Sequence, residues 1–117
     1  MLFAYEQKTG IMKREGSYIW TGYSGHGVGT NNVEFENVHD VGPIPRGAYV
    51  FGKPEDHPKL GPYAVPIIPK PGTNTFGRSG FYLHGDDAEH DASLGCIVKS
   101  PRPAREIVHE GDELTVV

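Results

Sequence analysis

The sequence contains a single cysteine, Cys96, and no long run of apolar residues. One cysteine cannot form a disulfide within the chain, so packing must stabilise the fold and the thiol stays available for chemistry. Hydrophobic residues make up 37% of the 117 residues, which is enough to build one core. We therefore predict a single domain, residues 1–117, with no membrane span.

An excess of positive charge is also lacking. The chain has 11 Lys and Arg residues against 15 Asp and Glu residues, a formal net charge of −4. The basic residues are scattered rather than gathered in a stripe, so a nucleic-acid partner is not expected. Glu6, Lys8 and Lys13 come too early for the apolar region of a signal peptide. We expect a protein that is made in the cytoplasm and does not use the general export pathway.

The sequence has few stretches long enough for a long helix, because 16 glycines and 10 prolines are spread along the whole chain. The runs between them are short, and they alternate polar with apolar residues or are rich in aromatic and β-branched ones, as strands are. The sequence therefore predicts a mostly β fold. The predicted strands span residues 2–7, 10–16, 17–23, 47–53, 63–69, 80–85, 95–100 and 112–117.

One short helix is expected directly after the strand that begins with Cys96. Within SPRPAREIVHEG, residues 100–111, Ser100 can cap a helix and Pro101 suits its first position. Gly111 can end the helix in a left-handed conformation.

Residues 21–47 form a long connection rich in glycine and asparagine, and such loops in compact domains are often functional. Its polar side chains either wall a cleft and bind a peptide or close turns on their own backbone, and the sequence leaves both possibilities open. The candidates are Tyr23, Ser24, His26, Asn31 and Asn32. Among other side chains common in binding sites, we interpret Trp20 as a core residue and His39, His57 and His109 as surface residues.

Cys96 has a candidate base in His84. A thiol is a weak nucleophile until a base or a positive neighbour favours its thiolate, so a catalytic cysteine needs a histidine nearby. One predicted strand ends at His84 and another begins at Cys96, with a polar loop between them. If these strands pair, both side chains gather at one end of the sheet.

Glycines adjoin both residues. The main-chain carbonyl of Gly85 can accept the ring N–H of His84 and fix its tautomer, as a carboxylate does in other triads. Gly95 permits a tight backbone turn, and N–H groups around Gly95 and Cys96 are placed to form an oxyanion hole. Ser93 adds a hydroxyl donor or holds the turn.

Two alternatives compete with catalysis by the thiol. An unpaired cysteine at the start of an apolar run also suits a buried structural residue. In addition, the loop carries a cluster of residue types that bind zinc or calcium, although its spacing matches no zinc motif. That cluster is His84, Asp86, Asp87, His90 and Asp91.

The run HGDDAEHDASLGCIVKS, residues 84–100, resembles the active-site signature of the L,D-transpeptidase catalytic domain. In that signature a histidine is followed by Ser or Thr and then by Gly-Cys near the end of the domain. The chain more specifically resembles the small L,D-transpeptidase-like toxins that bacteria deliver by type VI secretion, with VGPIPRGAYVFG, FGRSGFYLHG and the closing GDELTVV in the same order. The resemblance implies an L,D-transpeptidase-like β-sandwich or barrel, one short helix after the cysteine, and no cofactor or metal.

The resemblance also implies roles for single residues. Cys96 would be the nucleophile, His84 the base and Gly85 the carbonyl that orients it, with Ser93 and Gly95 supporting the turn. The chain departs from larger L,D-transpeptidases, because Leu94 replaces the histidine before Gly-Cys and no Arg or Asn follows soon after. The substrate carboxylate is then left to one of three basic residues: Lys99, Arg102 or Arg78.

The target implied by the resemblance is the stem tetrapeptide of bacterial peptidoglycan, cleaved at the L,D bond before D-alanine in position four. Hydrolysis would make the protein a carboxypeptidase, and attack by a free D-amino acid would exchange the residue. Secretion machinery would deliver it to the periplasm of target bacteria, and a cognate immunity protein would protect the producer. The rival hypothesis is a non-catalytic module of a phage or secretion apparatus that binds peptidoglycan or a partner protein.

Overall fold

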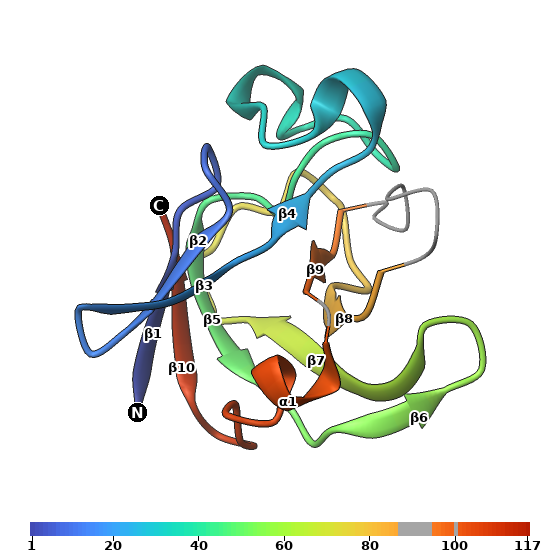
Figure 1. Cartoon of the computed structure of the whole chain (residues 1–117). Coiled ribbons are helices and arrows are strands. Elements are labelled where there is room, and N and C mark those ends of the chain that lie inside the picture. The colour runs from blue at the N-terminus through green and yellow to red at the C-terminus, as the bar shows by residue number, and fades with distance from the viewer. Residues whose placement is uncertain (87–94, 100) are drawn as a thin grey trace.

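Short strands account for most of the regular structure, as the spread of glycine and proline predicts (Figure 1). The structure is a computed structural model that describes residues 1–86, 95–99 and 101–117. The predicted mostly β class is confirmed. The strands are β1 (Leu2–Tyr5), β2 (Ile11–Arg14), β3 (Ser17–Thr21), β4 (Tyr23–Ser24), β5 (Gly47–Phe51), β6 (Glu55–His57), β7 (Gly61–Pro69), β8 (Tyr82–His84), β9 (Ile97–Val98) and β10 (Glu113–Val116).

Helices are few and short in the described part of the chain. They are the 3-10 helices η1 (Gly27–Gly29) and η2 (Val33–Phe35) and the α-helix α1 (Arg102–Arg105). None of them is long and apolar enough to cross a membrane.

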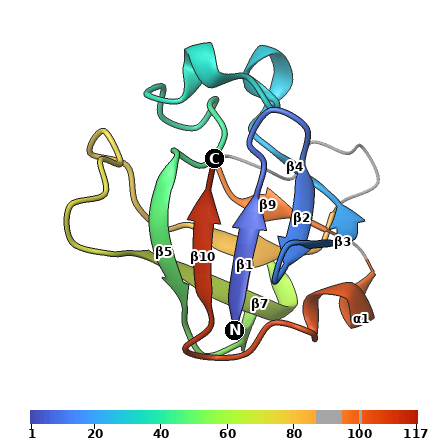
Figure 2. The same ribbon diagram turned by 90° about the vertical axis from the view of Figure 1, so that its left-hand side faces the viewer.

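The strands pair along one path, β3-β2-β1-β10-β5-β7-β8-β9-β4, and β6 adds a further pair with β7. Two of these pairs are parallel, β1 with β10 and β8 with β9. The first of them sets the opening strand beside the closing one, so the two ends of the chain lie in one layer (Figure 2). The second brings together the two segments that hold His84 and Cys96.

The sheet curls round on itself (Figure 1). Its two edge strands, β3 and β4, are consecutive in the chain, with only Gly22 between them. A Cβ at Gly22 would overlap the carbonyl oxygen of Val98, and one at Gly10 would overlap the carbonyl oxygen of Gly22. The backbone of Gly22 therefore packs tightly between strand segments from both ends of the path, which gives the sheet the form of an open barrel.

Aromatic and aliphatic side chains from both halves of the curled sheet fill its interior. Trp20 is 6% exposed, so its interpretation as a core residue is confirmed, and its Nε1–H donates to the carbonyl of Ala104 at 3.0 Å. This bond ties α1 to β3. The largest fully buried apolar side chains are Phe3, Tyr5, Met12, Ile44, Tyr49, Phe51, Leu83, Ile97 and Leu114.

Helix α1 is shorter than predicted, since it ends at Arg105 instead of continuing to Gly111. Val108 explains the early end: it is fully buried in the core, and its N–H donates to the carbonyl of Arg105 in a tight turn. Gly111, with φ of 90°, then donates its N–H to Phe51 and leads into β10. Ser100, the predicted cap, lies outside the described residues, and Pro101 occupies the N-cap position.

We predict that Gly22→Ala lowers the free energy of unfolding by about 3 kcal/mol, because the added methyl group meets a strand backbone that cannot yield easily. Urea denaturation of the purified proteins would measure the loss. Gly16→Ala is the matched control, since a Cβ there meets nothing within 4 Å and only its φ of 83° causes strain. That strain costs about 1 kcal/mol. Equal losses in the two variants would contradict the tight closure at Gly22.

Candidate active site

The parallel pair of β8 and β9 positions the two candidate catalytic residues. Leu83 lies opposite Ile97 and His84 opposite Val98, so Cys96 precedes β9 at the level of Tyr82. Alternate residues of a strand point to the same face, which places Cys96 and Val98 on the side of Tyr82 and His84. Parallel strands need a connection of about a dozen residues, and residues 85–96 supply it.

His84 and Cys96 line the same pocket, which has a volume of about 360 Å³. The sequence predicted their proximity from the pairing of two strands, and the pairing exists in a parallel arrangement. The other residues that line the pocket are Asp40, His57, Lys59, Leu60, Ser79, Gly80 and Tyr82.

His84 is held in one tautomer. Its ring is 1% exposed, and Nδ1 lies 2.7 Å from the carbonyl oxygen of Gly85. A carbonyl only accepts, so Nδ1 carries the proton and donates it, which leaves Nε2 with its lone pair. Nε2 is buried and has no hydrogen-bond partner among the described residues. A buried nitrogen in this state is suited to accept a proton from a nearby group.

Burial lowers the pKa of His84 below its ordinary value, because the charged ring loses its hydration. The Gly85 carbonyl opposes this effect, since it stabilises the ring that donates to it, while the positive charge of Arg105 lowers the pKa further. At neutral pH the imidazole is therefore uncharged and able to act as a base.

Cys96 is 9% exposed, and its Sγ donates to the carbonyl oxygen of Gly80 at 3.7 Å. Burial raises the pKa of the thiol to about 11, although a hydrogen bond from the backbone of Tyr82 and the charge of Arg78 act in the opposite direction. The resting pair at neutral pH is thus a neutral thiol and a neutral imidazole. Nucleophilic attack by this thiol needs a base to remove its proton.

Arg78, predicted as a substrate contact, lies behind the nucleophile. It is 5% exposed, and its guanidinium donates to the carbonyl oxygens of Glu36 at 2.6 Å, Pro43 at 2.8 Å and Gly42 at 2.9 Å. A Cβ on Gly95 would overlap one of its nitrogens. Arg78 therefore fastens the long loop to the turn before Cys96 and places a positive charge beside the thiol.

Arg105, which is not among the site residues predicted from the sequence, makes a similar set of contacts near His84. It is 4% exposed and donates to the carbonyl oxygens of Tyr63 at 3.2 Å, Lys99 at 2.8 Å and Pro62 at 3.0 Å. A Cβ on Gly85 would lie 3.2 Å from one of its nitrogens. No sequence signal distinguishes this inward arginine from the exposed Arg102 three positions earlier.

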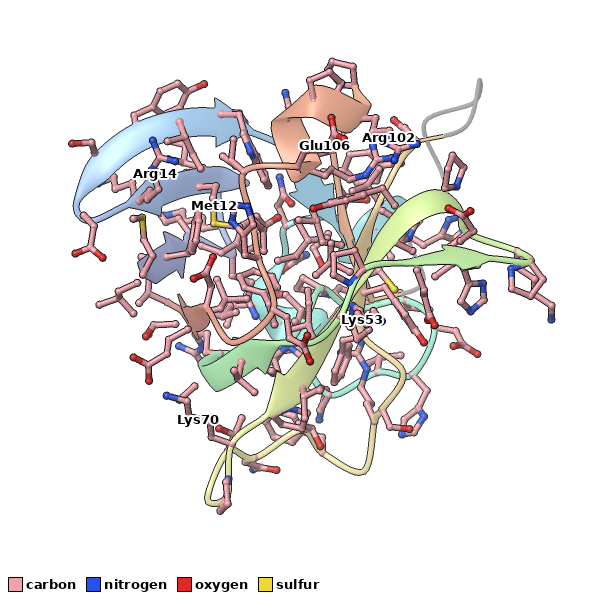
Figure 3. All side chains as sticks on the ribbon, turned by 90° about the horizontal axis from the view of Figure 1, so that it is seen from below. Met12, Arg14, Lys53, Lys70, Arg102 and Glu106 are labelled. Atoms are coloured by element: carbon pink, nitrogen blue, oxygen red, sulfur yellow. The ribbon has the colours of Figure 1, made fainter. Side chains whose placement is uncertain are left out.

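The two other basic candidates point elsewhere. The Nζ of Lys99 donates to the carbonyl of Thr21 at 3.0 Å and lies 5.8 Å from the centre of the Trp20 ring. Figure 3 shows Arg102 of α1 next to Glu106, the C-cap residue of this helix, and the two side chains form an ion pair at 3.4 Å. Neither Lys99 nor Arg102 is among the described residues that line the pocket.

The candidates from the long loop mostly hold the loop itself. Ser24 Oγ accepts from the N–H of Ile44 at 2.8 Å, and Asn32 caps η2 by accepting from the N–H of Glu34 at 3.1 Å. The ring of His26 is partly buried, and its Nδ1 has no hydrogen-bond partner among the described residues.

Tyr23 is the loop candidate that lies beside the site. Its hydroxyl donates to Oδ1 of Asp86 at 2.6 Å. Asp86 directly follows Gly85, whose carbonyl orients His84. The strand that carries Tyr23 also pairs with β9, at Val98. Tyr23 thus supports the backbone at the end of β8 from the opposite side of the cysteine strand.

The interpretation of His57 as a surface residue is wrong. Its ring is half-buried, lines the pocket and packs edge-on against Tyr82, with ring centres 5.1 Å apart. Nδ1 accepts from the N–H groups of Lys59 and Leu60, at 3.0 and 3.2 Å. The polar neighbours of His57 in the sequence gave no sign of this packing. His39 and His109 are exposed, as expected.

Ser93 and the possible metal ligands Asp87, His90 and Asp91 lie outside the described residues. Among residues 1–86, 95–99 and 101–117, no group of three or more His, Cys, Asp or Glu side chains is arranged to hold a metal ion.

The chain is similar in structure to several solved L,D-transpeptidases. An enzyme from Mycobacterium smegmatis aligns with 20% identity and a TM-score of 0.57, covering 99% of this chain and 58% of the other. L,D-transpeptidases 1 and 3 from Mycobacterium tuberculosis align with 21% and 18% identity and TM-scores of 0.56 and 0.55, each covering 99% of this chain and 60% of theirs. The chain thus spans about three fifths of these proteins, and the likeness establishes an L,D-transpeptidase-like fold.

The sequence itself identifies the family. The profile of the Tlde1 domain matches residues 19–114, which is most of the chain, and the chain belongs to this family of type VI secretion effectors. No curated protein matches the sequence. Fold and family together support an activity related to peptidoglycan.

We predict that the rate of Cys96 alkylation by iodoacetamide rises about tenfold for each pH unit between pH 7 and 9, because a thiol with a raised pKa of about 11 forms little thiolate in this range. Stopped samples analysed by intact-mass spectrometry would give the rates. Cys96→Ala is the control for the site of modification, since the chain has no other cysteine. A rate that is already constant below pH 8 would mean that the thiolate is preformed.

Proposed function

We propose that this protein is a cysteine-dependent L,D-carboxypeptidase or L,D-transpeptidase that acts on the stem tetrapeptides of bacterial peptidoglycan. The observation that carries the proposal is the state of His84: its Nδ1 donates to the carbonyl of Gly85, its Nε2 is buried with no hydrogen-bond partner among the described residues, and the residue lines the same pocket as Cys96. A structural histidine of this burial would ordinarily have both nitrogens satisfied. The Tlde1 family and the L,D-transpeptidase-like fold agree with this substrate class.

In the first step Nε2 of His84 takes the proton of the Cys96 thiol as Sγ attacks the carbonyl carbon of the third stem residue. The new S–C bond forms while the carbonyl electron pair moves onto oxygen. Backbone N–H groups at Gly95 and Cys96 are proposed to stabilise this oxyanion by donating hydrogen bonds to it. The positive guanidinium of Arg78, which lies near Cys96, is proposed to stabilise the negative charge of the oxyanion as well. The protonated His84 keeps its bond to Gly85 throughout.

In the second step the tetrahedral intermediate collapses and the C–N bond to the fourth residue breaks. His84 returns its proton to the nitrogen of the departing D-alanine, so the D-alanine leaves with a neutral amine group. A thioester between Cys96 and the third stem residue remains. A low pKa makes the imidazolium of His84 a strong acid for this transfer.

In the third step a nucleophile resolves the thioester. Water gives the trimmed tripeptide and makes the protein a carboxypeptidase, whereas the amine of a free D-amino acid gives an exchanged peptide. His84 removes the proton from either nucleophile and returns it to the sulfur as the C–S bond breaks.

The proposed biological role is that of an antibacterial effector. Type VI delivery would carry the protein to the periplasm of a target cell, where the substrate lies, and the producer would need a cognate immunity protein. The family assignment supports this role.

We predict that Cys96→Ala lowers turnover of the disaccharide tetrapeptide by at least about 1,000-fold, because it removes the nucleophile. Cys96→Ser should be almost as inactive. Mass spectrometry of reactions with and without D-methionine would separate hydrolysis from exchange, and circular dichroism would check that the variants fold. Retained turnover in a folded variant would exclude the cysteine mechanism, and loss of wild-type activity with EDTA that zinc restores would instead favour a metal centre.

We also predict that toxicity depends on the compartment. Expressed as it stands in a Gram-negative host, the chain should be tolerated, because its proposed substrate lies outside the cytoplasmic membrane. Behind a cleavable periplasmic signal it should stop growth or swell the cells, while its Cys96→Ala form should not. Growth curves and a blot for periplasmic protein would measure this, and equal toxicity from the cytoplasm would count against a peptidoglycan target.

A further inference from the structure

The pocket contains a lysine that no step of the proposed reaction uses. We propose that Lys59 binds the terminal carboxylate of the fourth stem residue and so selects peptides with a free C-terminus. This inference rests on the proposed function and adds to it the residue that sets the preference for tetrapeptides.

The charges around the pocket point to Lys59. The leaving residue carries its carboxylate one carbon away from the amine that departs, so the group that binds it must lie in the same pocket as Cys96. Lys59 lines that pocket, whereas Lys99 and Arg102 do not. Arg78 lies close to Cys96, but its guanidinium already donates to three backbone carbonyls behind the turn.

The backbone of Lys59 is fixed relative to the nucleophile. Its N–H donates to Nδ1 of His57 at 3.0 Å, and the His57 ring packs against Tyr82 with centres 5.1 Å apart. Tyr82 in turn provides a backbone hydrogen bond to Cys96. A short series of contacts therefore joins Lys59 to the reacting sulfur, so the lysine Cα has a defined position.

The side chain of Lys59, in contrast, is available for a ligand. The residue is exposed at the rim, and its ammonium makes no ion pair with a carboxylate of the described residues. Asp40 lines the same pocket with the opposite charge. A carboxylate in the pocket would thus be attracted by Lys59 and repelled by Asp40, which provides an internal comparison for the experiment.

The test compares two substrates, a disaccharide tetrapeptide with a free terminal carboxylate and the same compound as its C-terminal amide. We expect wild-type kcat/KM to favour the acid by at least about tenfold, the effect of one hydrogen bond to a charged group. Lys59→Gln should bring this ratio close to one by raising KM for the acid, with the amide unchanged. Lys59→Arg should keep the preference, and Asp40→Asn should keep or increase it.

Lys13→Gln is the matched control, because it removes the same charge from an exposed position of strand β2 that does not line the pocket, and it should leave the ratio unchanged. A Lys59→Gln enzyme that keeps the wild-type ratio, or that loses both substrates equally, would overturn the assignment of Lys59 alone. A wild-type protein that cleaves neither substrate would overturn the proposed function and the assignment with it.

Discussion

The parallel pairing of β8 with β9 is the constraint on which the site depends. These strands have only three and two residues, and such short strands are stable only within a larger sheet. Strand β7 pairs with the other edge of β8, and β4 pairs with the other edge of β9. The N–H of Lys99 extends the pairing of β8 with β9 by donating to the carbonyl of His84 at 2.9 Å. Because this register fixes Val98 opposite His84, it also fixes the place of Cys96, two residues earlier, at the level of Tyr82.

Two buried arginines keep the surrounding loops in place. Arg78 and Arg105 each donate to three backbone carbonyls, Arg78 beside the cysteine turn and Arg105 beside the end of β8. Their positive charges act on the two candidate catalytic residues in different ways. Arg78 lowers the pKa of the Cys96 thiol against the larger effect of burial, while Arg105 adds to the effect of burial and lowers the pKa of His84 further.

The sequence predicted the mostly β class, nearly every strand of the sheet and the carbonyl of Gly85 as a partner for His84. These features depend on residues that are close together in the sequence, such as a turn or a run of alternating polar and apolar residues, so the sequence pattern predicts them directly. The inward turn of Arg105 and the packing of His57 on Tyr82 could not be predicted, since both depend on which distant segments the curled sheet brings together. The early end of α1 has the same origin, because the chain leaves the helix after Arg105 so that Val108 can be buried in the core.

The central claim is that the Gly85 carbonyl holds His84 as a neutral imidazole whose Nδ1 carries the proton and whose Nε2 does not. Nitrogen-15 NMR of the imidazole rings tests this directly, with a His84→Gln sample to assign the signals among the six histidines. The account predicts a protonated Nδ1 and a bare Nε2 at pH 7, with a titration midpoint below the ordinary value of 6.5. A proton on Nε2, or a ring that is already charged at pH 7, would contradict it.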